Sequence, residues 1–253
     1  MAFFYKKIQN NMTLAVFYSA IILALTLFVS VLVGVVALVS VRDTGDAISV
    51  TGSTNKHVVS DSVKWSSNIS RTVREKGLKD GYALMSKDLS DVLNFFKTNG
   101  YTEKDLNISP VFMDQVYDYR ANQDPNAEKE YTLRQNIEIQ SSDVEKVTAM
   151  AKNVQSLISR GVLFSAGAPQ YYYSKLSDLR VELLSMAIRD AKARAEQIAK
   201  SGGKKVGSLK SASSGVVQVL APNSLEIMDY GTYDTSSVEK DIMVTVKAVF
   251  SIK

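Results

Sequence analysis

Histidine and cysteine carry much of the nucleophilic and metal chemistry of proteins, and this sequence has almost none of either. His57 is the single histidine, and there is no cysteine among the 253 residues. The chain therefore lacks disulfides, thiolate nucleophiles and cysteine ligands for zinc or iron–sulfur clusters. No Gly-x-Ser-x-Gly nucleophile motif accompanies His57. We predict that His57 lies in a surface turn, with a role as general base as the less favoured alternative.

Two other stretches share residue types with ligand-binding loops. The stretch from Asp118 to Asp124 lacks the ligand spacing and the glycine of a calcium-binding loop. Phosphate-binding glycines precede a helix, whereas Gly202-Gly203 before Lys204-Lys205 follows a predicted one, which favours a helix stop. The sequence thus predicts no catalytic, cofactor-binding or metal-binding residue, no cofactor, and a protein that is not an enzyme. An envelope hydrolase or ligand-binding protein is the alternative, and a Ser–Lys pair or paired carboxylates in a cleft would be its signature.

Aromatic and basic residues offer two further surfaces. The run Tyr171-Tyr172-Tyr173 fits core or subunit-contact packing better than a stacking platform, because strand alternation points two of the three rings one way. Basic residues are interspersed with acidic ones from Arg180 to Lys200, which predicts a solvated helix face, with a contact to an anionic polymer or a subunit as the alternative. The net charge is only +4 and is spread along the chain, so we expect no nucleic-acid partner.

The most decisive stretch of the sequence is apolar. Residues 12–41 carry no charge and exceed the roughly 20 residues that a helix needs to cross a bilayer. This run is longer than the apolar region of a cleaved signal peptide, so we predict a transmembrane anchor in contact with lipid. Lys6 and Lys7 precede it, and the positive-inside rule then places residues 1–11 in the cytoplasm. Residues 42–47 form a linker, and residues 48–253 form a domain on the outer side of a cytoplasmic membrane.

Periodicity predicts the elements of that domain. Apolar residues recur every three or four positions in three helices, and every second position in the strands. The third helix presents Leu179, Leu183, Ala187, Ala191, Ala195 and Ile198 along one face. A capping box beginning at Ser142 opens the second helix. The strands are predicted at 48–51 (ending in a turn at Gly52), 63–70, 106–112, 131–139, 162–173 and 242–252, with helices at 78–96, 144–158 and 177–200 and polar loops at 121–130 and 208–238.

We predict an order of about ββαββαβαββ, in which a strand without assigned bounds precedes the last one. Strand pairs separated by short loops favour antiparallel neighbours, and helices follow the pairs, so the fold class is α+β with antiparallel sheets packed by helices. The last strand is the most regular, with Ile242, Val244, Val246, Ala248, Phe250 and Ile252 predicted to share one face, toward the core.

Three segments carry a resemblance to a known family. They are the opening run Ile48-Ser49-Val50-Thr51-Gly52, the helix stretch 187–199 with its Ala/Arg pattern, and the closing strand 242–252. With Gly203 and Lys205-Val206-Gly207 after the helix, the chain resembles the SIMPL-domain family over about residues 47–253. That family includes periplasmic immunogenic proteins and oxidative-stress-defence proteins of bacteria.

The resemblance implies an extracytoplasmic domain in the periplasm, assembly into ring-like homo-oligomers in some members, and a link to envelope or oxidative stress. It supplies no catalytic residues. We therefore expect a membrane-anchored, non-enzymatic assembly or binding module that associates with copies of itself in the cell envelope.

Overall fold

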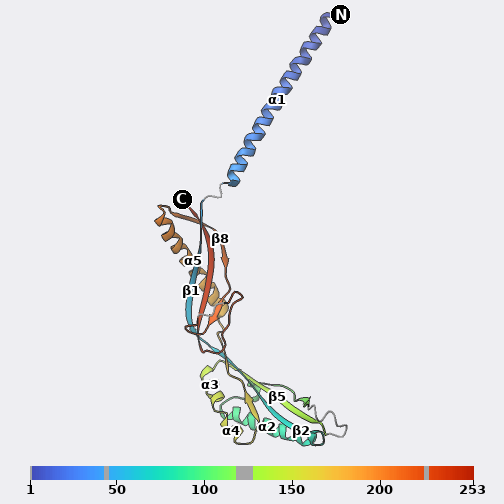
Figure 1. The fold of residues 1–253 in the computed structure, drawn as a ribbon, viewed down its shortest axis with the longest axis vertical. Helices are drawn as coiled ribbons and strands as arrows, with labels where there is room; N and C mark the ends of the chain where they lie inside the picture. The colour runs from blue at the N-terminus through green and yellow to red at the C-terminus, as the bar shows by residue number, and fades with distance from the viewer. Residues whose placement is uncertain (1, 43–45, 118–127, 225–227) are drawn as a thin grey trace. The chain divides into compact units, whose positions relative to one another are not determined.

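The computed structural model describes residues 2–42, 46–117, 128–224 and 228–253. Helix α1 (Ala2–Arg42) comes first (Figure 1). Within it, Val16–Ala37 is long and apolar enough to cross a membrane, and the side chains of this stretch are not buried by protein. A signal sequence near an N-terminus meets the same criterion of length and composition. The apolar helix predicted from the sequence is therefore present.

The chain divides into two compact units. The first unit comprises residues 1–50, 192–212 and 248–253, and the second comprises residues 51–191 and 213–247. Two sheets run through them. The first sheet has the strand order β1 (Ala47–Val59), β10 (Glu239–Ile252), β8 (Val206–Ser214), and β9 (Gln218–Leu220) pairs with β10 as well.

The second sheet lies in the second unit and is built around two long strands. Strand β2 (Ser62–Arg74) pairs antiparallel with β5 (Glu130–Ser141) over twelve residues, from Val63 opposite Ser141 to Arg74 opposite Glu130. The short strands β3 (Leu106–Ile108) and β4 (Phe112–Gln115) pair with β5, and β6 (Phe164–Ala166) and β7 (Gln170–Tyr172) pair with β2.

Helices pack on this second sheet because its inward side chains are large and apolar. Trp65 of β2 and Phe96 of α2 (Leu78–Thr98) lie in one core, with ring centroids 5.9 Å apart. Arg71 of β2 also grips Asp88 of α2 through two hydrogen bonds of 2.6 and 2.8 Å. The remaining helical elements of this region are η1 (Glu75–Gly77), η2 (Glu103–Asp105), α3 (Val144–Lys152) and α4 (Gln155–Ile158).

A long helix, α5 (Leu176–Ser201), packs on the first sheet. Leu179 and Leu183 of α5 share a core with Val58, Ile242 and Val244. The predicted alternation of β10 is confirmed for five of the six residues, from Ile242 to Phe250, which are buried. Ile252, at the end of the strand, is only half-buried. The α+β class with antiparallel sheets is confirmed too.

The order of elements differs from the predicted one. Strand β1 does not end at Gly52 but continues to Val59, because Gly52 is an ordinary strand residue at a close helix contact. Strands β8 and β9 lie where a polar loop was predicted for residues 208–238. The strand predicted at 162–173 is two strands of three residues, β6 and β7. The loop predicted at 121–130 falls mostly outside the described residues.

Three details of the predicted helices are wrong. The second helix breaks after Lys152, and its N-cap is Asp143, whose carboxylate accepts the Lys146 amide, rather than Ser142. In α5 the buried stripe continues from Ala195 to Ala199, four residues on, and Ile198 is 55% exposed.

Candidate functional site

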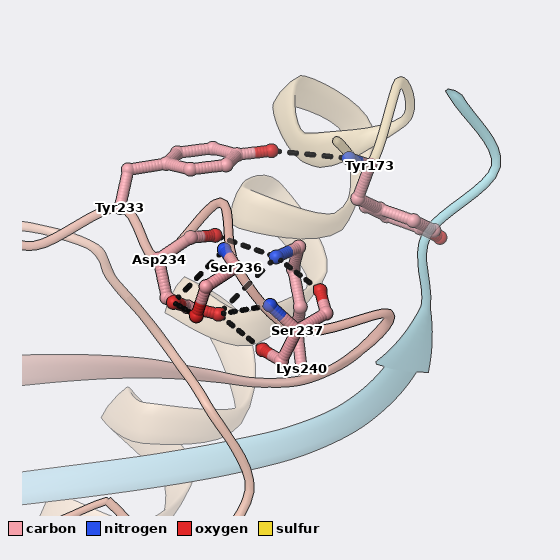
Figure 2. A network of polar contacts seen from close by, with 6 residues as sticks. All are labelled: Tyr173, Tyr233, Asp234, Ser236, Ser237 and Lys240. Atoms are coloured by element: carbon pink, nitrogen blue, oxygen red, sulfur yellow. Dashed lines mark hydrogen bonds and ion pairs between the residues drawn. The ribbon is translucent and has the colours of Figure 1, made fainter. Parts of the chain in front are cut away.

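A buried lysine is the most unusual charged residue in the described part of the chain. Lys240, near the start of β10, has a relative exposure of 0%. Its Nζ donates hydrogen bonds to the carbonyl oxygens of Asp234 (2.5 Å) and Ser237 (2.8 Å), and lies 3.5 Å from Oδ2 of Asp234 (Figure 2). The three hydrogens of the ammonium group thus face three oxygens of one turn.

Asp234 organises that turn from within. Its Oδ1 accepts the amide and hydroxyl of Ser236 at 3.1 and 2.6 Å, and its Oδ2 accepts the amide of Ser237 at 3.1 Å and the hydroxyl of the same residue. Burial raises the pKa of Asp234, but these four hydrogen bonds outweigh burial and hold it well below its usual range. Burial also lowers the pKa of Lys240, against the opposing effect of Asp234.

A serine beside a buried lysine is the signature that would favour a hydrolase, so the direction of each hydrogen bond decides what this cluster can do. A lysine base must be neutral and must accept the proton of the serine hydroxyl. Here the hydroxyl of Ser237 donates to Asp234, while Nζ of Lys240 donates to carbonyl oxygens. The geometry fits a charged lysine that ties a turn together, and it leaves neither group free to activate the other.

The turn is fastened to β7 through tyrosines. The hydroxyl of Tyr233 accepts the amide of Tyr173 at 3.0 Å, and the rings of Tyr172 and Tyr233 lie 5.8 Å apart (Figure 2 shows the first contact). Tyr171 is buried in the core of the second sheet, and its amide donates to the carbonyl of Thr235 at 2.8 Å. Packing, rather than an open stacking platform, thus occupies Tyr171 and Tyr172.

His57 lies on strand β1 and not in a turn, so that part of the prediction is wrong, although the side chain is exposed as expected. Its Nδ1 is 3.0 Å from Oδ1 of Asp241, and its Nε2 is 3.9 Å from Oε2 of Glu239. These are cross-strand pairs at a solvent-exposed face. Among the described residues there is no group of three or more histidine, cysteine, aspartate or glutamate side chains that could hold a metal ion.

The glycine–lysine run after α5 is a helix stop, as predicted. Gly203 has a φ of +70°, and the amide of Lys204 returns to the carbonyl of Ala199 at 2.8 Å, which satisfies the last carbonyls of the helix. The side chain of Lys204 forms an ion pair with Asp46 and so lowers the pKa of that carboxylate, through a hydrogen bond first and charge attraction second.

The segments that carried the family resemblance meet in the structure. A β-carbon added to Gly52 would lie 2.1 Å from the carbonyl oxygen of Ala187, so only glycine lets α5 approach β1 this closely. One residue on, the amide of Ser53 donates to the carboxylate of Asp190 at 2.8 Å. Gly52, Ala187 and Asp190, which lie in two of these segments, therefore serve to pack α5 against β1.

Sequence reasoning missed Lys240 and its turn, yet two signals were available. The run Asp234-Thr235-Ser236-Ser237 has the residue types that bond to their own backbone in turns. Lys240 also shares its strand face with Ile242 and Val244, so the alternation that placed those residues in the core points Lys240 inward as well.

Comparison with known families gives one match that spans most of the domain. The model of the family SIMPL, described as "Protein of unknown function (DUF541)", matches residues 48–250. No curated protein is significantly similar to the chain.

Proposed function

This chain belongs to the SIMPL family, and from that premise we propose that it is a membrane-anchored, non-enzymatic assembly module that associates with copies of itself outside the cytoplasmic membrane. The observation that carries the proposal is strand β8, a nine-residue strand at one end of its sheet whose residues from Ser208 to Ser214 are all exposed. An open strand edge offers a row of main-chain donors and acceptors that another strand can bind.

The two edge strands of that sheet, β1 and β8, differ in how far other parts of the chain cover them. On β1, the amide of Ser53 is already bonded to Asp190, and Lys56 pairs with Glu182 of the same helix at 3.1 Å. Side chains from a covering helix are one way in which proteins block strand addition. In the described part of the chain, β8 has β10 as its strand neighbour on one side and no strand on the other. This asymmetry favours β8 as the contact edge.

The anchor supports self-association for a physical reason. Copies held in one plane by α1 share an orientation and a high effective concentration, so weak contacts suffice to hold them together. Head-to-tail contacts whose rotation closes produce rings. The excess of Lys6 and Lys7 before the apolar run supports an N-terminus in the cytoplasm and a domain on the other side.

The non-enzymatic part of the proposal draws its support from the polar cluster. Lys240, Asp234 and Ser237, which have the residue types of a hydrolytic site, bond to one another in a closed turn that fixes the start of β10. A catalytic group must instead reach a substrate.

The experiment is a mass measurement of the full-length protein in detergent, for wild type and two variants of Ser214. Because the amide of Gly215 donates to Thr245 of β10, the amide of Ser214 points to the open edge. Ser214→Pro removes that donor, whereas Ser214→Ala keeps it. We expect a high-mass species for wild type and Ser214→Ala, and a shift toward monomer for Ser214→Pro. A monomeric wild type across micromolar concentrations would overturn the proposal.

A further inference from the structure

Positive charge is concentrated in one part of the folded chain. Residues 46–50, 192–212 and 248–253, the part of the first unit outside α1 and its connection, contain seven basic and two acidic side chains, a formal net charge of +5. The second unit contains twenty basic and twenty-three acidic side chains, a formal net charge of −3. The overall value of +4 conceals this division.

Backbone bonds bring several of these lysines together. The amides and carbonyls of Lys205 and Lys253 exchange two hydrogen bonds of 2.8 Å, which makes them directly opposite neighbours on adjoining strands. Like charges directly opposite each other destabilise a strand pair unless a counter-charge compensates them. Lys204 precedes Lys205 in the chain, and its amide donates to the carbonyl of Ala199, next to Lys200 at the end of α5. The side chains of Lys200, Lys204, Lys205 and Lys253 are all exposed. We call Lys200, Lys204, Lys205 and Lys253 the lysine corner.

The short chain segment between α1 and the lysine corner is enough to keep the corner near the anchor. The carbonyl oxygen of Asp46 accepts the amide of Ile252 at 2.8 Å and its carboxylate pairs with Lys204, so Asp46 lies beside the lysine corner. Only four peptide units separate Asp46 from Arg42, the last residue of α1, and an extended chain of that length spans at most about 14 Å. Five further residues, rising about 7.5 Å in a helix, lead back to Ala37 at the end of the apolar span.

We propose that the lysine corner docks on the anionic headgroups of the bilayer that holds α1. The inference rests on the proposed anchoring. The corner has the charge that attracts such a surface, and its tether keeps it close to the headgroup region, where basic side chains are drawn to anionic lipid within about a Debye length of 8–10 Å. The exposed side chain of Ile198, on the last turns of α5, adds an apolar group of the kind that enters the interface. Docking would fix the sheet relative to the membrane.

The test uses the full chain reconstituted in vesicles. Since the chain has no cysteine, Gln197→Cys, at an exposed position of α5, accepts one donor dye, and energy transfer to a headgroup-labelled lipid reports docking. We expect stronger transfer in phosphatidylcholine mixed with phosphatidylglycerol than in phosphatidylcholine alone, and a reversal by high salt. Changing Lys200, Lys205 and Lys253 to glutamine should lower the docking equilibrium on the order of 100-fold.

Two matched variants complete the test. The same three positions changed to arginine keep the charge and should keep docking. Lys79, Lys97 and Lys104, exposed in the second unit, changed to glutamine remove the same charge elsewhere and should also keep it. If the protein floats with vesicles, two results would overturn the docking proposal. One is energy transfer that is the same with and without anionic lipid, and the other is an equal loss of transfer in this second variant. Failure to float with either lipid mixture would overturn the anchoring and the docking together.

Discussion

Gly52 of β1 and Ala187 of α5 approach so closely that a β-carbon on Gly52 would lie 2.1 Å from the carbonyl oxygen of Ala187 and 2.5 Å from the amide nitrogen of Ala191. Both neighbours are backbone atoms, which cannot rotate away as a side chain can. The small residues of the helix stripe and the glycine of the strand are therefore two halves of one contact.

The first prediction concerns that contact. Gly52→Ala forces α5 away from β1 and should lower the free energy of unfolding by about 3 kcal/mol or more, at the upper end of what overpacking costs. Thermal unfolding of the full-length protein in detergent, followed by circular dichroism, measures the loss. Gly77→Ala is the control, because nothing lies within 4 Å of an added β-carbon there, and its effect should stay within about 0.5 kcal/mol. Similar melting of the two variants would refute the close-contact explanation.

The second prediction concerns the two faces of β10. Val246 is buried and Lys247 is exposed on the other face. Val246→Asp places an unpaired carboxylate in the core and should cost several kcal/mol, enough to unfold a marginally stable domain. Lys247→Asp should cost about 0.5 kcal/mol or less. Equal damage in a denaturant titration would mean that another copy or another layer covers Lys247 as well.

The third prediction follows from the depressed pKa of Asp234. A carboxylate whose folded pKa lies below its unfolded value of about 3.9 stabilises the fold above that value, and this stability is lost as pH falls. Wild type should therefore lose stability between about pH 5 and pH 2, and Asp234→Asn should lose less over the same interval. Melting temperatures across that range test it. Parallel curves for the two proteins would show that Asp234 is not linked to folding in this way.

Elements with an apolar period of their own can be predicted from the sequence, whereas elements defined by pairing with a distant strand cannot. The helices at 78–98 and 176–201 and the strands β2, β5 and β10 have long apolar periods of their own, and each was predicted. Strand β8 has no such period. It is rich in serine, and pairing with β10 defines it, with Gly207 in the strand and Gly215 just after it fitted against Ser251 and Thr245. The residue pattern of one segment holds no information about a pairing strand that lies about forty residues away.

The same limit applies to the candidate site. Residue type alone does not predict a role for Lys240, because lysine is most often a surface residue. Its burial depends on a turn whose carbonyl oxygens replace water, and only the structure shows that replacement. The predicted burial of Ile198 is wrong for a different reason. Ile198 and Ala199 both fit a helical period after Ala195, and the close packing of small residues along α5 buries the alanine instead.

The last prediction concerns topology, and it uses the absence of native cysteine. Single variants Gln9→Cys, before the apolar span, and Ser211→Cys, on exposed β8, each offer one thiol. In intact cells stripped of outer layers, a membrane-impermeant maleimide should label Ser211→Cys at once and Gln9→Cys only after permeabilisation, because Lys6 and Lys7 favour an N-terminus inside. The opposite pattern would reverse the orientation. Intact-mass measurement of the labelled Ser211→Cys chain adds the second half of the test, since a chain that has lost its first forty or so residues would identify the apolar helix as a cleaved signal sequence rather than an anchor.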